Sequence, residues 1–415
     1  MTPRRVAHVL RKYDPSEWGG TETHVAAITA RQPALGWLPE VHAPAGPLPL
    51  DGQVRGGASL RRFNAFVPFL GPAERRRALV ANAGNIASFD EPMRLVRDRG
   101  LALAHLHTAG RLGGGVRFAM RLTGRPYVVS VHGPLLAQRE WLAEDVRARH
   151  ERLVDVGQPI GALFGARHVY RDAARIITFN EEERRALEPS AGARVLRMDH
   201  GVDVARLAAG DARRALARWP LLARGPLLVV VGRLCAQKNQ VLAVRAFAAG
   251  APPDAQLALA GAATDLAARD EILAEARRLG VGERVHVLGN LDVEREVPDL
   301  FAAATLVLVP SRHEAFGLVA LEAWAAGRPT LMAARSGLAE LAAAAGPDAL
   351  TVSSLEPDEW ARALDAALGD ASKRAACAAA GRALVRARFD WDRVTARLTA
   401  LYDEVLDERA EERAA

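Results

Sequence analysis

Short apolar runs alternate with longer stretches of mixed polarity along most of the chain. The runs are rich in Val, Leu and Ile and predict β-strands, while the segments between them, such as 21–34 and 265–278, are typical of helices. The strands are expected at residues 6–10, 101–107, 127–132, 175–178, 227–232, 256–260, 284–288, 305–309, 329–332 and 349–352. Strands that alternate with helices predict an α/β protein with doubly wound parallel sheets.

This alternating series starts twice. A strand followed by Gly19-Gly20 opens the first half, a strand followed by Gly232-Arg233 opens the second, and a polar stretch rich in Ala and Arg lies between them. We therefore predict two Rossmann-like domains, at 1–205 and 206–388. The residues from 389 to 415 are expected to form a C-terminal helix that packs back on the first domain.

Composition narrows the class of protein. The chain has 415 residues, enough for two domains with their own cores. Its formal net charge of +6 is compatible with anionic partners, but a general bias of the sequence toward Arg and Ala is the favoured explanation. It contains only two cysteines, which fits a reducing compartment. We find no signal peptide, no apolar run long enough to span a membrane and no nucleic-acid motif. We expect a cytoplasmic protein without a nucleic-acid partner.

Lysine is scarce in this chain. Of the 55 basic residues, only Lys12, Lys238 and Lys373 are lysines. Because Arg is used almost everywhere else, a retained Lys suggests a site that needs a compact point charge. Lys238 is the strongest candidate, since it follows a predicted strand end by a few residues.

Several reactive side chains follow predicted strands, where open α/β sheets bind ligands. His107 and His132 end two strands of the first half, and Arg233 and Glu314 follow two strands of the second. Gly19 and Gly20 follow the first strand. These positions predict a ligand site at the carboxyl edges of the sheets.

The stretch SRHEAFGLVALEAWAAGRP, which starts at Ser311, carries the sharpest pattern. Gly317 opens an apolar helix, whose free N–H groups favour an anion. Glu314 lies just before this point, and Glu322 lies about 7 Å further along the helix axis. A buried carboxylate needs a partner, so we expect a ligand with a central anion and hydroxyl groups at both ends. A nucleoside diphosphate sugar has this layout.

The same segments resemble family 4 of the retaining glycosyltransferases, which have the GT-B fold. HEAFGLVALEAWAAGRP is similar to the E-x7-E element of that family, and VGRLCAQKN is similar to its GR…K element. HGVD, WGGTETHV, VSVHG and FDWDRVTARLTALY resemble further family segments in the same order. The resemblance implies two Rossmann-like domains that face each other across a cleft.

The resemblance also implies roles for individual residues. Glu314 would bind the donor sugar, Glu322 the ribose, and Arg233 and Lys238 the diphosphate. His132 would lie beside the reacting sugar. The remaining expected site residues are Gly19 and Gly20 in the donor–acceptor crevice, Ala315, Phe316, Gly317 and Leu318 at the donor, and His107 on the acceptor side.

The implied reaction transfers a sugar with retention from a nucleoside diphosphate sugar to the hydroxyl of a sugar, a lipid-linked molecule or a small molecule. We expect no cofactor and no metal, because Arg233, Lys238 and the helix start supply the positive charge that the leaving diphosphate needs. His105 and His107 share a strand face and could hold a metal, but no third ligand is evident. The D-x-D of residues 390–392 is interpreted as a helix N-cap.

Two departures from the family pattern and three alternatives stay open. His200 and Ser336 stand where the family often has Asn and Gly. A GT-B nucleotide-sugar epimerase shares the fold, and a non-catalytic partner subunit could bind the same ligand. A pyridoxal-dependent phosphorylase is disfavoured because few lysines could form its Schiff base.

One segment, residues 61–77, combines aromatic residues with two flanking arginine clusters. It could contact a membrane or a lipid-linked acceptor as an amphipathic patch. The favoured interpretation is that it docks onto its own domain. Peripheral membrane association is therefore the weaker expectation.

Overall fold

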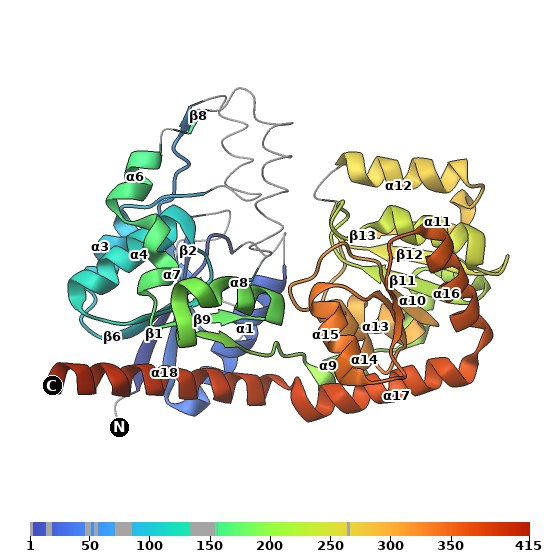
Figure 1. Ribbon diagram of the computed structural model, residues 1–415. Helices are drawn as coiled ribbons and strands as arrows, with labels where there is room; N and C mark the ends of the chain where they lie inside the picture. The colour runs from blue at the N-terminus through green and yellow to red at the C-terminus, as the bar shows by residue number, and fades with distance from the viewer. Residues whose placement is uncertain are drawn as a thin grey trace. The chain divides into compact units, whose positions relative to one another are not determined.

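Two parallel β-sheets organise the chain in the computed structural model, shown in Figure 1. The structure describes residues 3–13, 19–45, 51–53, 57–70, 85–132, 154–155, 157–263 and 266–415. The first unit consists of Met1–Met198 together with Trp391–Ala415, and the second consists of Asp199–Asp390.

The sheet of the first unit has the strand order β10-β9-β7-β6-β1-β2-β4-β3. Every pairing is parallel except that of β3 with β4. The strands of this sheet are β1 (Arg4–Val9), β2 (Trp37–Pro44), β3 (Asp51–Gln53), β4 (Ser59–Phe63), β6 (Leu101–Leu106), β7 (Tyr127–Ser130), β9 (Arg175–Thr178) and β10 (Val195–Arg197). A short antiparallel pair, β5 (Phe69–Leu70) and β8 (Val154–Asp155), stands apart.

Helices connect these strands. They are α1 (Gly20–Arg31), α3 (Asp90–Arg97), α4 (Gly110–Thr123), α6 (Gln158–Leu163), α7 (Val169–Asp172), α8 (Glu181–Ala191) and α18 (Trp391–Ala414), with 3-10 turns at Gln32–Leu35, Ala166–His168 and Gly192–Arg194. Fully buried Val9, Leu106 and Val116 belong to one apolar core that joins the sheet to α4.

The second unit has a six-stranded sheet in the order β13-β12-β11-β14-β15-β16, and all its pairs are parallel. Its strands are β11 (Leu227–Val231), β12 (Gln256–Ala260), β13 (Val285–Gly289), β14 (Leu306–Val309), β15 (Thr330–Ala333) and β16 (Leu350–Val352). Its helices are α9 (Val204–Ala208), α10 (Ala212–Arg218), α11 (Gln240–Gly250), α12 (Leu266–Arg278), α13 (Glu296–Ala303), α14 (Leu318–Ala325), α15 (Ser336–Ala345), α16 (Pro357–Gly369) and α17 (Ala371–Arg388), with 3-10 turns at Pro220–Arg224 and Gly282–Arg284. Strands β11 and β14 are apolar throughout because helices cover both faces of such a sheet.

Helix α18 belongs to the first unit although it ends the chain. Tyr402 is fully buried and packs edge-on against Trp37, with 5.1 Å between the ring centroids. Asp392 forms an ion pair with Arg31 of α1 at 2.5 Å. The second acid of the D-x-D therefore takes part in a contact between helices, and Asp390 directly precedes the helix.

In the first sheet, the pattern did not predict β10, at one edge, or the group β2, β4 and β3 at the other end of the strand order. Strand β2 contains two prolines, and β4 contains Arg61 and Arg62, which interrupt an apolar run. Arg62 is nonetheless buried, because its guanidinium donates to the backbone carbonyls of Tyr13 and Pro44. Tertiary contacts thus place a charged residue inside a strand that sequence pattern alone disfavours.

The described part of segment 61–77 belongs largely to its own domain. Phe63 is only 2% exposed and joins the apolar core, and Arg62 is held as above. Residues 71–77 lie outside the described residues. In the described parts of the chain, no helix is both long enough and apolar enough to cross a membrane.

Candidate active site

Three loops meet at the carboxyl ends of the neighbouring strands β11, β14 and β15. The backbone N–H of Arg312 donates to the carbonyl of Gln237 at 2.9 Å, and the amide of Gln237 donates to the carbonyl of His313 at 3.1 Å. The backbone N–H of Gly337 donates to the carbonyl of Glu314 at 3.0 Å. These bonds hold the residues that the sequence nominated on one edge of the sheet.

Lys238 and Glu314 form the charged centre of this edge. Lys238 Nζ lies 2.5 Å from Glu314 Oε1, and the Ser311 hydroxyl donates to the same oxygen at 2.7 Å. Both charged side chains are largely buried, so their attraction is less screened than that of a surface pair. An ammonium has three donors, so Lys238 can pair with Glu314 and still donate to an anionic ligand.

Two positions at this edge require glycine, Gly317 for its backbone conformation and Gly337 for the close approach of a neighbouring loop. Gly317 precedes α14 with φ +93°, and a Cβ there would lie 2.5 Å from the Leu338 side chain. A Cβ on Gly337 would lie 2.6 Å from the carbonyl oxygen of Ala315. Both glycines thus let the Glu314–Leu318 loop approach α15 closely, and Gly317 opens the start of α14 to an anion.

The first departure from the family pattern, at Ser336, is accommodated by a side-chain contact. Ser336 adopts φ +46°, a region that glycine enters more easily. Its hydroxyl lies 2.9 Å from Nδ1 of His313, in the loop that leads to Glu314. The serine side chain therefore adds a hydrogen bond between two loops of the site, which a glycine could not make.

The second departure, at His200, lies beneath the site. His200 is buried, and its ring lies 5.7 Å from the ring of Phe316. Burial lowers the pKa of His200 to about 3, so the ring is neutral at physiological pH. Its contact supports Phe316, one of the expected donor-site residues.

Glu322 lies on α14 and is half-buried. Within the described residues, its carboxylate has no hydrogen bond or ion pair. Burial raises the pKa of Glu322 to about 7, against the opposing influence of Arg206 and Lys238. A partly buried carboxyl group with a raised pKa and no partner among the described residues is typical of a residue that binds a ligand.

Arg233 follows β11 and is exposed. Its carbonyl accepts a hydrogen bond from Gln240 at 2.9 Å, which fixes its backbone. Its guanidinium has no partner among the described residues. It is therefore available to an anion at the edge that also carries Lys238.

The residues expected in the first unit form a second group. His107 and His132 follow β6 and β7, and Nδ1 of His107 lies 2.8 Å from Nε2 of His132. Gly19 and Gly20 lie at the start of α1, where the N–H of Gly19 donates to Glu22 at 3.1 Å. Within the first unit, the structure thus brings these two histidines together.

The sequence showed no third side chain beside His105 and His107, but the structure places a third imidazole there. His8, on the neighbouring strand β1, completes one imidazole trio, and His24, His107 and His132 form another. The ligand nitrogens within each trio lie within 4.8 Å of one another. Sequence spacing did not reveal them because β1 and β6 become neighbours only through the sheet order.

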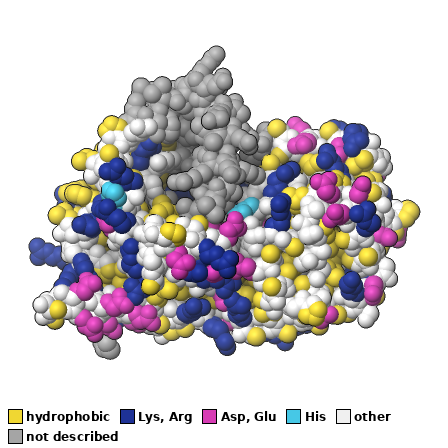
Figure 2. All heavy atoms as spheres, in the orientation of Figure 1, with side chains coloured by type: hydrophobic (Ala, Val, Ile, Leu, Met, Phe, Trp, Pro, Cys, Tyr) yellow, Lys and Arg dark blue, Asp and Glu magenta, His cyan; other side chains and the backbone are white. Residues whose placement is uncertain are grey.

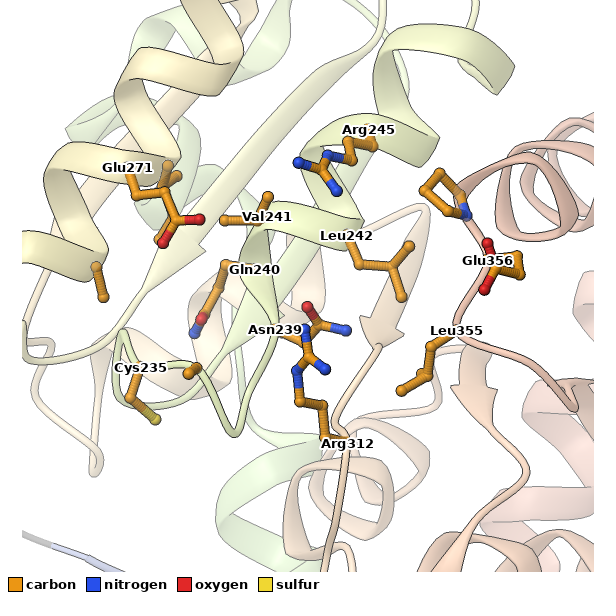
Figure 3. Close-up of a pocket in the computed structure, with 14 residues that line it drawn as sticks. Cys235, Asn239, Gln240, Val241, Leu242, Arg245, Glu271, Arg312, Leu355 and Glu356 are labelled. Atoms are coloured by element: carbon orange, nitrogen blue, oxygen red, sulfur yellow. The ribbon is translucent and has the colours of Figure 1, made fainter. Parts of the chain in front are cut away.

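A hollow of about 400 Å³ lies beside the second-unit site (Figure 3). It is lined by Cys235, Ala236 and Asn239, by Arg312, and by residues of α11, of α12 and of the segment 355–357. None of the expected donor-binding side chains lines it. The charged residues described above, rather than this hollow, define the candidate site.

Basic side chains do not gather into one continuous field on the face seen in Figure 2. Lys and Arg alternate there with Asp and Glu. Several arginines form ion pairs, including Arg117 with Asp172 and Arg388 with Asp199. This mixed surface does not have the single-sign stripe typical of nucleic-acid binding.

Comparison with known proteins identifies the family. Residues 19–199 match the family described as glycosyl transferase 4-like domain, and residues 214–384 match the glycosyl transferases group 1. A D-inositol 3-phosphate glycosyltransferase of Acidothermus cellulolyticus is 30% identical, over 98% of this chain and 92% of that relative. The chain belongs to family 4 of the GT-B glycosyltransferases.

For other relatives, the match with this chain spans a smaller share of the relative's own length. The D-inositol 3-phosphate glycosyltransferase of Nocardia farcinica is 32% identical over 74% of this chain, and the match spans 66% of that relative, just under two thirds.

Solved structures confirm the GT-B fold. A sucrose-phosphate synthase from Thermosynechococcus elongatus has a TM-score of 0.76 at 20% identity, covering 98% of this chain and 100% of that chain. Anabaena Alr3699/HepE in complex with UDP and glucose has a TM-score of 0.73 at 19% identity, covering 97% and 100%. At these identities the likeness concerns the fold.

Proposed function

We propose that this family 4 protein is a retaining glycosyltransferase that moves a sugar from a nucleoside diphosphate sugar to a hydroxyl acceptor. The observation that carries the proposal is the edge formed by Lys238, Glu314 and the glycine-opened start of α14, with Glu322 about one turn into the helix. This edge offers an anion site between two carboxylates, as the two ends of a sugar nucleotide require.

The proposed roles follow from charge and position. Arg233, Lys238 and the N–H groups at the start of α14 bind the diphosphate and stabilise the charge that develops as the glycosidic bond breaks. Glu314, fixed by Lys238, accepts hydrogen bonds from the donor sugar. Glu322 accepts hydrogen bonds from the ribose. Ala315, Phe316 and Leu318 contribute backbone around the phosphates.

The first unit contributes the remaining proposed groups. His132 lies beside the reacting sugar, His107 supports it from the acceptor side, and Gly19 and Gly20 line the approach. No metal is needed in this scheme, because side chains and a helix terminus already provide the compensating charge.

The names of the relatives select the first compounds to test. UDP and UDP-glucose occur in the solved complexes of Anabaena Alr3699/HepE, so a uridine diphosphate sugar is the proposed donor class. The curated relatives are D-inositol 3-phosphate glycosyltransferases, so a phosphorylated cyclitol is the first acceptor to test.

The test is an assay of purified protein with a panel of sugar nucleotides, each with and without D-inositol 3-phosphate. We expect acceptor-dependent release of nucleoside diphosphate, and a product whose anomeric configuration by NMR equals that of the donor. An inverted product contradicts retention. Release of free nucleotide with an epimerised sugar in the absence of acceptor indicates the epimerase, and binding without turnover of any donor indicates a non-catalytic subunit.

A further inference from the structure

The interior of the first unit contains a line of hydrogen-bonded imidazoles that the proposed reaction uses only at one end. Nε2 of His8 lies 2.9 Å from Oε1 of Gln32, and Nδ1 of His8 lies 3.0 Å from Nε2 of His107. Nδ1 of His107 in turn lies 2.8 Å from Nε2 of His132. The line therefore runs from a buried amide to the strand end that carries His132.

These separations indicate N–H···N hydrogen bonds rather than two ligands of one metal ion. Two nitrogens on a tetrahedral zinc lie about 3.3 Å apart, since each Zn–N bond is about 2.0–2.1 Å long. The nitrogen pairs of the line are shorter than that, at 2.8 and 3.0 Å, and lie in the ordinary range for a hydrogen bond.

The inner members of the line are neutral. His8 is fully buried and His107 is 7% exposed. Burial lowers the pKa of His8 to about 4, and burial together with the neighbouring imidazoles lowers the pKa of His107 well below its usual value. A neutral imidazole has one N–H donor and one acceptor nitrogen. Each ring therefore donates to one neighbour and accepts from the other, so all hydrogen bonds of the line run in the same direction.

The amide of Gln32 sets the direction of these hydrogen bonds. Gln32 is fully buried at the end of α1, and its carbonyl oxygen can only accept. His8 therefore donates from Nε2 to Gln32 and accepts at Nδ1 from Nε2–H of His107. His107 then accepts at Nδ1 from Nε2–H of His132. The protonated nitrogen of a histidine is set by the hydrogen bond that its other nitrogen makes.

We propose that Gln32 and His8 are positioning residues that hold His132 in its Nε2–H tautomer, so that Nδ1 of His132 acts as a hydrogen-bond acceptor toward a hydroxyl of the bound donor. The proposal rests on the proposed function for the identity of that ligand, but the tautomer itself is a property of the protein alone. Neither Gln32 nor His8 contacts substrate in this scheme.

A second buried pair in the same region supplies a matched control. The Tyr402 hydroxyl lies 2.5 Å from Nδ1 of His105, and Nε2 of His105 lies 2.7 Å from Ser130 Oγ. The His105 ring lies near that of His107, tilted by 33° with 4.1 Å between the ring centroids, but its two nitrogens bond Tyr402 and Ser130 rather than the line. Ser130→Ala removes the buried hydrogen bond to Nε2 of His105 and leaves the line intact. Tyr402 is unsuitable as the control, because its side chain also hydrogen-bonds Gln32 at the end of the line.

The first measurement is long-range ¹H–¹⁵N NMR of the histidine rings in the full chain without ligand at pH 7.5, with signals assigned by single substitutions. We expect His8, His107 and His132 all to be protonated on Nε2 alone. An Nδ1–H tautomer or a charged ring at His132 overturns the proposal. This result does not depend on turnover, so it separates failure of the proposal from failure of the proposed function.

The second measurement compares variants. In His8→Leu we expect His132 to show both tautomers, and kcat to fall about tenfold, the equivalent of one neutral hydrogen bond, with donor KM and nucleotide Kd unchanged. His8→Asn, whose side-chain oxygen can replace Nδ1 as acceptor, should restore most of kcat. The control Ser130→Ala should change neither the His132 tautomer nor kcat.

Other patterns contradict the proposal. An unchanged His132 tautomer in folded His8→Leu excludes the positioning role, as does an equal loss of kcat in His8→Leu and His8→Asn. If His8→Leu does not fold, Gln32→Met provides the same test from the other end of the line, because it removes the terminal acceptor at similar volume.

Discussion

The two units place their chemistry in different ways. In the second unit, Lys238, Glu314 and Gly317 lie on short loops at the ends of neighbouring strands, and hydrogen bonds between the loops hold them. In the first unit, His8 lies in β1, and His107 and His132 follow β6 and β7. Hydrogen bonds join the three rings in a line that is buried at His8 and His107. Residues that directly follow a strand can be recognised from local spacing, whereas His8, which lies inside a strand, cannot.

The largest effect should come from the cations of the second unit. Arg233→Ala and Lys238→Ala should each lower kcat by roughly 10² to 10³, the cost of losing one preorganised charge at a developing anion. Arg233 gives the cleaner test, because no described residue pairs with its guanidinium, whereas Lys238→Ala also leaves Glu314 without its partner. Steady-state kinetics on variants with native circular dichroism measure the effect.

Lys373→Ala is the matched control for this prediction. Lys373 is another of the three lysines and is exposed on α17, so its loss should leave kcat unchanged. Near-normal turnover in both Arg233→Ala and Lys238→Ala would remove the diphosphate role from this edge.

A smaller effect should separate the two acids. Glu322→Gln should weaken binding of free nucleoside diphosphate by roughly tenfold to a hundredfold, because a charge-assisted hydrogen bond to the ribose is worth about 1.5–3 kcal/mol. Glu314→Gln should not weaken that binding, since the free nucleotide has no sugar, but it should lower turnover because small misplacements near the reacting carbon are costly. Calorimetry with the nucleotide and kinetics with the intact donor distinguish the two. An equal loss of nucleotide affinity in both variants, or in neither, contradicts the arrangement along one ligand.

The pKa of Glu322 predicts a further dependence on pH. Its folded-state pKa, about 7, is raised above the usual value by burial, and the ribose binds the ionised form. Nucleotide affinity should therefore rise as pH increases from 6 to 8, by up to about tenfold for one group of this pKa. Glu322→Gln should lack this component, whereas the ligand's own ionisation acts equally on both proteins. Parallel pH profiles for wild type and variant would show that Glu322 does not titrate at the site.

The smallest expected effect is that of a chelator. After metal stripping, excess EDTA should leave activity within about twofold of the untreated enzyme, because Arg233, Lys238 and the start of α14 supply the compensating charge. Loss of activity that manganese or magnesium restores would contradict this prediction and direct attention to the imidazole trios of the first unit.

Much of the fold could be predicted because buried parallel strands are continuous apolar runs. Strands β9 and β12 were predicted at their observed bounds, and all six strands of the second sheet were predicted to within a residue or so. Strands β2 and β4 were missed, since prolines and arginines interrupt them and only the neighbouring strands make them part of a sheet.

The candidate site was likewise predictable only in part. The positions of Arg233, Lys238, Glu314 and Glu322 followed from spacing around strand ends, but the ion pair between Lys238 and Glu314 did not, because 76 residues separate them. Ser311 was missed as the second partner of Glu314 for lack of any distinguishing pattern. His8 and Gln32 were missed because single polar residues in apolar segments give no periodic signal.

The central claim is that one sugar nucleotide lies along the carboxyl edge of the second sheet, and a crystal structure with an intact uridine diphosphate sugar tests it most directly. We predict the ribose hydroxyls within hydrogen-bond distance of Glu322, the diphosphate against Arg233, Lys238 and the start of α14, and the sugar hydroxyls at Glu314. A nucleotide bound elsewhere, for example in the hollow lined by Cys235 and Glu356, or bound with its ribose away from Glu322, would contradict the account.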